Sequence, residues 1–312
     1  MISAYFLGHG LWTVIPHQLE ENFKDMVDCG YTDVAISFSE SEMRYARRAF
    51  ELMIKLAKKQ GLKCLVIPSR LGGRFAGAPL MPNVWLSMNP QYSIPSPGWM
   101  PVGCLESKEF REWAIEFMDI LVKDYDIDGI IWDEPKSAGV ISKHPDTIAK
   151  YGKEPTTEQM QDSFVEFIEM LTGHCLAVKP HLSFTLFAQI TDPEYFTSKA
   201  AGIKGVEYFG YDGSLSSQSF FHEEPSFGEK YPLGSVWDWT LKECKNAGKK
   251  TFALVENILM PDTSIPMYEE NFETYLKTYK PDHLSIYYYG HNNEDPEAVH
   301  KITKKLMKKY LR

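Results

Sequence analysis

The sequence predicts an α/β protein that folds as a single (β/α)8 TIM barrel over residues 1–312. Short, largely apolar, β-rich runs alternate with longer amphipathic runs along the whole chain, and eight such β-then-α units follow one another. The apolar runs lack a strict polar alternation, which is typical of parallel strands buried on both faces. The length of 312 residues suits one barrel with extended loops, since this fold typically takes about 250 residues.

Each expected strand is a short apolar run. The first begins close to the N-terminus, and the fourth ends just before Pro135. Proline has no amide hydrogen to donate and therefore terminates a strand. The expected strands are Ile2–Leu7, Thr32–Phe38, Lys63–Pro68, Ile127–Asp133, His181–Phe187, Lys204–Phe209, Lys250–Glu256 and His283–Tyr288.

Amphipathic runs between these strands predict the helices. In the run Glu40–Lys59, apolar residues recur at a spacing that forms a helical stripe. Residues that favour helix ends agree with this pattern, because Ser39 precedes the run and Gly61 follows it. The other expected helices are Lys108–Tyr125, Thr157–Val178, Ser235–Ala247, Tyr268–Tyr279 and Asp295–Leu311.

Three connections are longer than a compact barrel requires, and each follows the carboxyl end of an expected strand. They are Ser69–Leu105 after the third strand, Pro135–Thr156 after the fourth and Gly210–Leu233 after the sixth. Long loops are often functional, and the loops that follow the strands build the active-site face of a barrel. We therefore expect a functional site at this end of the strands.

Charge and motifs argue against several classes of function. The net charge of −9 disfavours a nucleic-acid partner, which would require a basic face. No apolar run reaches the roughly 18 residues of a membrane span, so we expect no membrane partner. No GxGxxG motif follows the first strand, which removes the main support for a dinucleotide cofactor.

The cysteines and the N-terminus predict a cytoplasmic protein. The five cysteines are scattered and form no CxxC motif, which is typical of reduced thiols. The first residues show neither the basic segment nor the long apolar segment of a signal peptide. The sequence leaves the oligomeric state open.

Carboxylates gather at the expected strand ends. Asp133 and Glu134 follow the fourth strand, and Glu256 ends the seventh. A carboxylate is costly at the edge of a buried sheet unless it is paired or used, so this concentration favours a function. Two carboxyl groups that face each other over the barrel mouth suit glycoside hydrolysis. The structural alternatives are a turn-capping role for Asp133 and Glu134 and a salt-bridged rim position for Glu256.

These residues carry a resemblance to the (β/α)8 retaining glycoside hydrolases with catalytic glutamates on strands 4 and 7. In that family an Asn-Glu-Pro motif often ends strand 4, where this chain has Asp133-Glu134-Pro135. The resemblance implies that Glu134 is the general acid/base and Glu256 the nucleophile. The departure is Asp133, since an ionised aspartate accepts hydrogen bonds but cannot donate them as the asparagine does.

The resemblance also implies two aromatic positions. A tyrosine near the end of strand 6 commonly supports the nucleophile in the family, and Tyr208 or Tyr211 would match it. An aromatic platform commonly follows strand 8, and Tyr288 or Tyr289 would match that one.

Asp133 also opens a second mechanism of the same class. Barrel glycosidases of the α-galactosidase type use an aspartate at the end of strand 4 as nucleophile and one after strand 6 as acid/base. Asp133 and Asp212 are similar to that pair. Glu256 would then have no catalytic role.

Two other classes of function stay open. One is a barrel isomerase, lyase or aldolase that uses a metal or a lysine, and His9, Asp133, Glu256 and His291 would be its metal ligands. No HxH or HExxH spacing supports it, and we expect neither a metal nor another cofactor. The other is a sugar-binding barrel without turnover.

A carbohydrate is the expected partner, because aromatic rings beside a few polar anchors are typical of sugar sites. Arg70 and Arg74 are expected either to bind a carboxylate or sulfate on the sugar or to pair with Glu40 or Asp133. The expected substrate-binding residues are Asp133, His9, Arg70, Trp85, Trp99, Trp132, Tyr208, Asp212, Asn257 and Tyr288.

Overall fold

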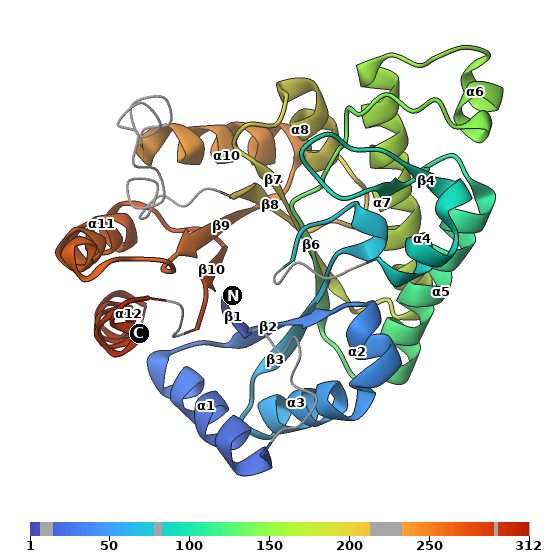
Figure 1. Ribbon diagram of the computed structural model, residues 1–312. Helices are drawn as coiled ribbons and strands as arrows, with labels where there is room; N and C mark the ends of the chain where they lie inside the picture. Colours follow the sequence, from blue (N-terminus) through green and yellow to red (C-terminus); the bar gives the residue numbers. More distant parts are fainter. Residues whose placement is uncertain (7–14, 78–82, 213–232, 290–292, 312) are drawn as a thin grey trace.

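The structure confirms the predicted barrel. It is a computed structural model that describes residues 1–6, 15–77, 83–212, 233–289 and 293–311. Eight parallel strands close into a barrel in the order β1-β10-β9-β8-β7-β6-β3-β2, seen along its axis in Figure 1. These strands are β1 (Ile2–Phe6), β2 (Asp33–Phe38), β3 (Lys63–Pro68), β6 (Gly129–Asp133), β7 (Ser183–Gln189), β8 (Tyr208–Asp212), β9 (Lys250–Glu256) and β10 (His283–Tyr287).

Helices surround the strands and connect each one to the next (Figure 1). Side chains at their first turns explain several of the starts. Ser39 and Thr156 form capping boxes with Glu42 and Gln159, and Asp295 accepts a hydrogen bond from the amide of Ala298. The outer helices are α1 (Pro16–Cys29), α2 (Glu40–Tyr45), α3 (Arg47–Lys59), α5 (Lys108–Asp124), α7 (Thr157–Val178), α8 (Glu194–Ala201), α10 (Leu233–Ala247), α11 (Ile265–Thr278) and α12 (Pro296–Tyr310).

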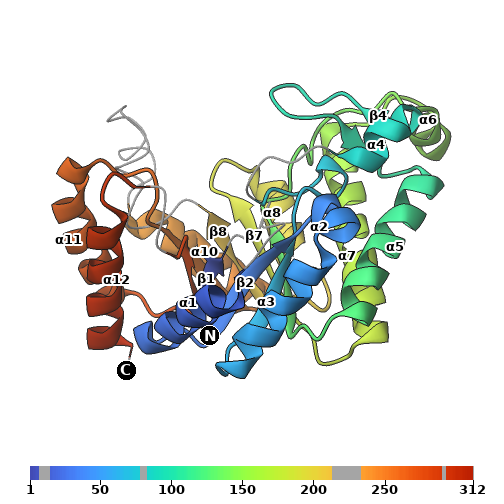
Figure 2. The same cartoon turned by 60° about the horizontal axis from the view of Figure 1, so that its bottom comes forward.

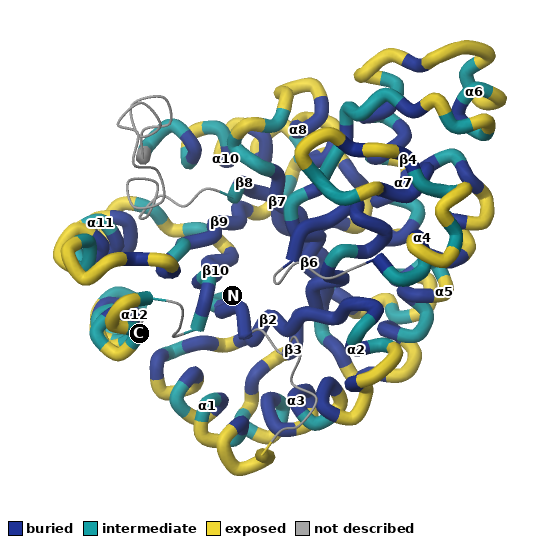
Figure 3. The backbone as a smooth tube through the Cα atoms, in the orientation of Figure 1, coloured by how far each residue is buried: buried dark blue, intermediate teal, exposed yellow. Residues whose placement is uncertain are grey.

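Side chains along the strands alternate between the barrel interior and the helix layer, as the period of a strand requires. Ile131 and Phe187 belong to the hydrophobic cluster inside the barrel. Their neighbours Ile130 and Trp132 belong to the cluster between strands and helices. Figure 3 shows the result as buried strands enclosed by helices whose outer faces are exposed.

A buried polar group lies inside the barrel at the amino ends of the strands. The imidazole of His283 is fully buried, with Nε2 2.8 Å from Ser3 Oγ and Nδ1 3.2 Å from Thr185 Oγ1. The ring of Tyr208 packs edge-on against it, with centroids 5.4 Å apart. Burial lowers the pKa of His283 to about 3, so this imidazole is neutral at physiological pH.

The sixth barrel strand corrects a prediction. It spans Tyr208–Asp212, whereas the sequence predicted Lys204–Phe209. The chain forms a turn at Lys204 and Gly205, where Gly205 has a φ of +84°. A left-handed residue interrupts an extended run, so the strand begins later. As a result Tyr208 opens the strand and Asp212 ends it.

The long connection after β3 contains structure of its own. It forms η1 (Leu71–Gly73), α4 (Val84–Met88), η2 (Pro90–Tyr92) and an antiparallel pair of strands, β4 (Ser93–Ile94) and β5 (Val102–Gly103). Figure 2 shows α4 and β4, together with α6 (Pro145–Tyr151) from the connection after β6, at the end of the molecule opposite the N-terminus.

A buried arginine joins these two connections. Arg74 Nε donates to Gly103 O at 2.8 Å, and Arg74 Nη1 donates to Ser137 O at 3.1 Å. Its side chain is fully buried and serves the loops, so the expectation that it contacts a sugar or pairs with Glu40 or Asp133 is wrong.

The connection after β8 falls mostly in residues 213–232, outside the described part of the chain. Within the described ranges, no helix is both long enough and apolar enough to cross a membrane.

Candidate active site

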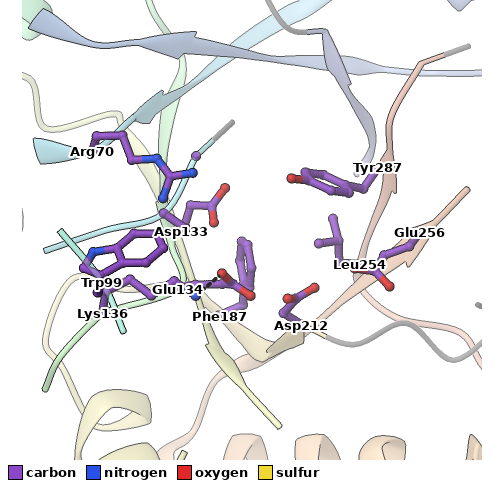
Figure 4. A pocket seen from close by; sticks show the side chains of 12 residues that line it. Arg70, Trp99, Asp133, Glu134, Lys136, Phe187, Asp212, Leu254, Glu256 and Tyr287 are labelled. Carbon is purple, nitrogen blue, oxygen red and sulfur yellow. Dashed lines mark ion pairs between the residues drawn. The ribbon is translucent and has the colours of Figure 1, made fainter. Parts of the chain in front are cut away.

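A pocket of about 200 Å³ opens at the carboxyl ends of the barrel strands (Figure 4). Its residues come from strands on both sides of the barrel and from the connections that follow β3 and β6. It is lined by Arg70, Ala76, Gly77, Trp99, Asp133, Glu134, Lys136, Phe187, Asp212, Leu254, Glu256 and Tyr287.

Three carboxylates reach the pocket because each is the last residue of its strand. Asp133 ends β6, Asp212 ends β8 and Glu256 ends β9. Each lies two residues beyond an inward position, so strand alternation directs it inward as well. The carboxyl ends of parallel strands meet at one rim of a barrel, which brings these groups together.

Glu134 joins the pocket for a different reason. Alternation alone would direct the side chain after Asp133 away from the interior, but Glu134 has a φ of +38°. This left-handed conformation is uncommon for a residue other than glycine. The turn is held by the amide of Ala76, which donates to Asp133 O at 2.8 Å and to Glu134 O at 3.2 Å. Consecutive residues therefore both present carboxyl groups to the pocket.

The environment of Asp133 favours its protonated form. This side chain is 4% exposed, and burial, followed by the negative charge of Glu134, raises its pKa from 3.8 to about 7. Tyr5 Oη donates a hydrogen bond to Asp133 Oδ2 at 3.2 Å, which only partly offsets that rise.

The environment of Glu134 favours its ionised form. Burial acts to raise its pKa, but the hydrogen bond with Asp212 and the charge of Lys136 outweigh burial and lower the pKa overall. Lys136 Nζ lies 2.5 Å from Glu134 Oε2, an ion pair drawn in Figure 4. A hydrogen bond between two carboxyl groups requires a proton on one of them. This hydrogen bond therefore links the protonation of Glu134 to that of Asp212.

One wall of the pocket is cationic and aromatic. Arg70 Cζ lies 4.8 Å and Lys136 Nζ 5.3 Å from the ring centroid of Trp99, distances at which a cation is attracted to an indole ring. Trp99 Nε1 donates to Gly73 O at 2.9 Å, which fixes the ring. We name Arg70, Trp99 and Lys136 the cationic wall.

Tyrosines from β1 and β10 lie on the other side of the pocket. The ring of Tyr287 packs edge-on against that of Tyr5, with centroids 5.0 Å apart, and Tyr288 Oη donates to Tyr287 Oη at 2.7 Å. Burial is the largest cause that raises the pKa of Tyr288 to about 12, and the charges of Asp133 and Glu256 both add to it. The two carboxylates therefore both lie near this tyrosine pair.

Of the residues predicted from the sequence, the structure brings Asp133, Glu134, Asp212, Glu256, Arg70 and Trp99 into this one pocket. Tyr288 adjoins it through its hydrogen bond to Tyr287. His9 lies outside the described residues, as does His291.

Two predicted residues point elsewhere. Trp132 occupies an outward position of β6, where its fully buried indole stacks on Phe75 at 4.9 Å and its Nε1 donates to Thr172 Oγ1 at 3.0 Å. Tyr208 opens β8 and lies against His283, at the amino end of the barrel. Neither side chain reaches the pocket, so the structure does not bring them together with the other residues predicted to bind the sugar.

Two further residues support loops. Trp85 stacks on Trp113 at 4.9 Å, outside the barrel, and its amide donates to Glu40 Oε2. Asn257 is 2% exposed, and its backbone amide donates a hydrogen bond to Tyr287 O at 2.9 Å. Neither lines the pocket.

Sequence reasoning missed Lys136 and Tyr287. Lys136 follows Glu134 by two residues in a predicted loop, and no periodicity places a loop side chain. Tyr287 could have been found, because it alternates with Ser285 on the inward side of the last strand.

Among the described residues, the group of possible metal ligands whose atoms all lie within 4.8 Å of one another is Asp25, Cys29 and His300. It lies outside the barrel, between α1 and α12. Asp25 is already paired there with His300 at 2.7 Å and with Lys304 at 2.6 Å.

No family model matches the chain, and neither does any curated protein. Solved structures do resemble it. A β-galactosidase from the Antarctic haloarchaeon Halorubrum lacusprofundi aligns with 99% of this chain at a TM-score of 0.74 and 9% identity. A β-galactosidase from the psychrophilic Marinomonas ef1 aligns with 98% at a TM-score of 0.67 and 10% identity. The chain spans 58% and 59% of the length of these two proteins.

A glycoside hydrolase family 5 mannosidase from Rhizomucor miehei is closer in length. It aligns with 99% of this chain and 92% of its own, at a TM-score of 0.64 and 10% identity. At such identities the likeness shows the fold, which is the (β/α)8 barrel.

Proposed function

We propose that the protein is a glycoside hydrolase. The observation that carries this proposal is the pocket at the carboxyl ends of the strands, where carboxyl groups whose pKa values are shifted in opposite directions lie beside an aromatic wall. Two carboxyl groups whose environments separate their pKa values are what acid catalysis paired with a nucleophile requires. The fold shared with galactosidases and a mannosidase supports the proposal.

We assign the proton donor to Asp133 rather than to Glu134. A general acid works best with a pKa near the operating pH, and the pKa of Asp133 is about 7. Glu134, expected from the sequence to be the acid, is held ionised by Asp212 and Lys136. In this assignment Glu134 is a positioning residue, whose charge keeps the proton on Asp133.

Glu256 remains the proposed nucleophile. It ends β9 beside Tyr287 of β10, across the barrel from β6. Asp133 gives its proton to the glycosidic oxygen while a Glu256 oxygen bonds to the anomeric carbon and the bond to the leaving group breaks. Asp133, now ionised, then takes a proton from water, whose oxygen displaces Glu256 from the anomeric carbon. Both carboxyl groups return to their starting states.

A second pair is favoured by one observation. Asp212 ends β8, faces the pocket and forms a hydrogen bond with Glu134. It would then be the acid, and Asp133 the nucleophile. The raised pKa of Asp133 opposes this pair, because a nucleophile must be ionised.

Covalent labelling tests the proposal. A panel of 4-nitrophenyl glycosides first identifies a sugar that the protein cleaves. The 2-deoxy-2-fluoro derivative of that sugar, with a dinitrophenyl leaving group, should then trap the glycosyl-enzyme, and peptide mass spectrometry should find it on Glu256. Glu256→Gln should take up no label, while the exposed Glu116→Gln of α5 should label as the wild type does.

The outcomes separate the alternatives. A label on Asp133 would establish the second pair. Absence of hydrolysis across α- and β-linked gluco-, galacto-, manno- and fucosides and the corresponding uronides would overturn the proposed function and leave a sugar-binding barrel.

A further inference from the structure

Charge is unevenly distributed in the pocket. The carboxylates stand at the ends of β6, β8 and β9, whereas Arg70 and Lys136 stand together on the cationic wall. Lys136 is already paired with Glu134. Arg70 forms no such ion pair, because no carboxylate in the described part of the chain lies within 4.0 Å of its guanidinium.

Arg70 carries donors that nothing in the described ranges satisfies. Its Nε and Nη1 are buried and have no hydrogen-bond partner there. An unsatisfied buried donor is costly, and a charged one more so. Such a donor is tolerated when a ligand supplies its hydrogen-bond acceptor. Arg70 lines the pocket, where a ligand could do so (Figure 4).

The backbone of Arg70 is held in place, and the ring of Trp99 lies beside its guanidinium. Arg70 has a left-handed φ of +58°, its amide donates to Ala76 O at 2.9 Å, and its carbonyl accepts from the amide of Gly73 at 2.9 Å. The ring of Trp99 supports it from one side and is itself bonded to Gly73. A fixed, stacked arginine is suited to recognising an anionic group.

We propose that the cationic wall binds an anionic substituent of the substrate, a carboxylate or a sulfate, so that the preferred sugar is an acidic one. This inference rests on the proposed function of the same pocket. The acidic group lies against Arg70 and Trp99, and the scissile bond lies between Asp133, beside this wall, and Glu256 across the pocket from it. Ion pairing of Lys136 with Glu134 and protonation of Asp133 reduce the negative charge that the substrate meets.

Matched substrates test the proposal. kcat/KM is measured for 4-nitrophenyl glucuronide against the glucoside, for the galacturonide against the galactoside, and for the galactoside 6-sulfate. We expect one acidic member to exceed its neutral partner by about 10- to 100-fold, the range of a charged hydrogen bond. The uronide and sulfate arms identify which anion is bound.

Variants connect the preference to Arg70. Arg70→Gln should bring the acidic-to-neutral ratio close to one, Arg70→Lys should retain part of it, and Arg48→Gln, on the exposed face of α3, should leave it as in the wild type. Equal cleavage of acidic and neutral sugars by the wild type would overturn the proposal. So would an unchanged ratio in Arg70→Gln.

Binding separates this inference from the proposed function. Free glucuronate, galacturonate and galactose 6-sulfate are titrated calorimetrically against the wild type and Arg70→Lys, with glucose as the neutral reference. Arg70-dependent binding without hydrolysis of any glycoside would refute the proposed function and leave the acidic ligand standing. Hydrolysis confined to neutral glycosides would refute the acidic ligand and leave the function standing.

Discussion

Replacing Glu134 by glutamine tests the assignment of the proton to Asp133. The pKa of Asp133 rises from 3.8 to about 7, and burial and then the charge of Glu134 are the two largest causes. This rise in the pKa of Asp133 corresponds to about 4 kcal/mol in favour of the protonated carboxyl group, since one pH unit corresponds to about 1.4 kcal/mol.

The contribution of Glu134 sets the size of the effect. Because burial is the larger cause, the charge of Glu134 supplies at most half of the upward contribution. Its removal also leaves Lys136, which lowers the pKa of Asp133, without its 2.5 Å partner. We therefore expect Glu134→Gln to lower the pKa of Asp133 by roughly one to two units.

The assay is the pH dependence of kcat/KM. Asp133 acts while protonated, so activity falls as pH rises through its pKa, near 7 in the wild type. In Glu134→Gln this alkaline limb should move to between about pH 5 and 6, which lowers kcat/KM at pH 7 by about 5- to 50-fold. Activity should recover near pH 5.

Two results would refute this reasoning. If Glu134 were itself the acid, Glu134→Gln would lose about 10²- to 10⁴-fold at every pH, with no recovery. If the alkaline limb stayed in place, the charge of Glu134 would not control Asp133. Glu116→Gln removes an exposed carboxylate from α5 and should reproduce the wild-type profile.

Three further predictions concern stability and metals. His283 has its pKa lowered from 6.5 to about 3, so its contribution to stability is complete above pH 6.5 and is lost as pH falls. Between pH 7 and pH 5 the free energy of unfolding, measured with urea, should therefore fall by about 2 kcal/mol more in the wild type than in His283→Gln. Equal decreases in the two proteins would contradict this. Trp132→Ala should lower the free energy of unfolding by about 3–5 kcal/mol without changing KM. A raised KM would instead indicate that Trp132 contacts the sugar. Dialysis against EDTA should leave kcat/KM unchanged, and a loss that zinc or magnesium restores would favour the metal-dependent alternative.

The barrel could be predicted because its signal is repeated. Eight apolar runs separated by amphipathic ones give many independent indications of one topology, and an error in one does not alter the others. The sixth strand illustrates such an error. The run Lys204–Phe209 looked extended, but Gly205 adopts a left-handed conformation that residue types alone did not reveal. The barrel closed regardless, since β8 still pairs with β7 and β9.

The site was more sensitive to register than the fold was. Side chains alternate along a strand, so a shift of one residue exchanges the two faces. Trp132 and Asp133 are adjacent, yet one packs against Thr172 in the helix layer and the other enters the pocket. Tyr208 was assigned to the carboxyl end because the strand was placed too early, and the observed register puts it at the amino end.

The turn at Glu134 explains why the sequence could not separate the roles of the two carboxylates. An extended chain would have sent Glu134 away from Asp133, and the two charges would have titrated independently. The left-handed φ of Glu134, fixed by hydrogen bonds from Ala76, brings both groups into one pocket. Their repulsion then favours only one ionised carboxylate, and Lys136 and Asp212 determine that it is Glu134. Protonation of Asp133 is therefore a consequence of backbone geometry and of a lysine in a loop, neither of which has a sequence signature.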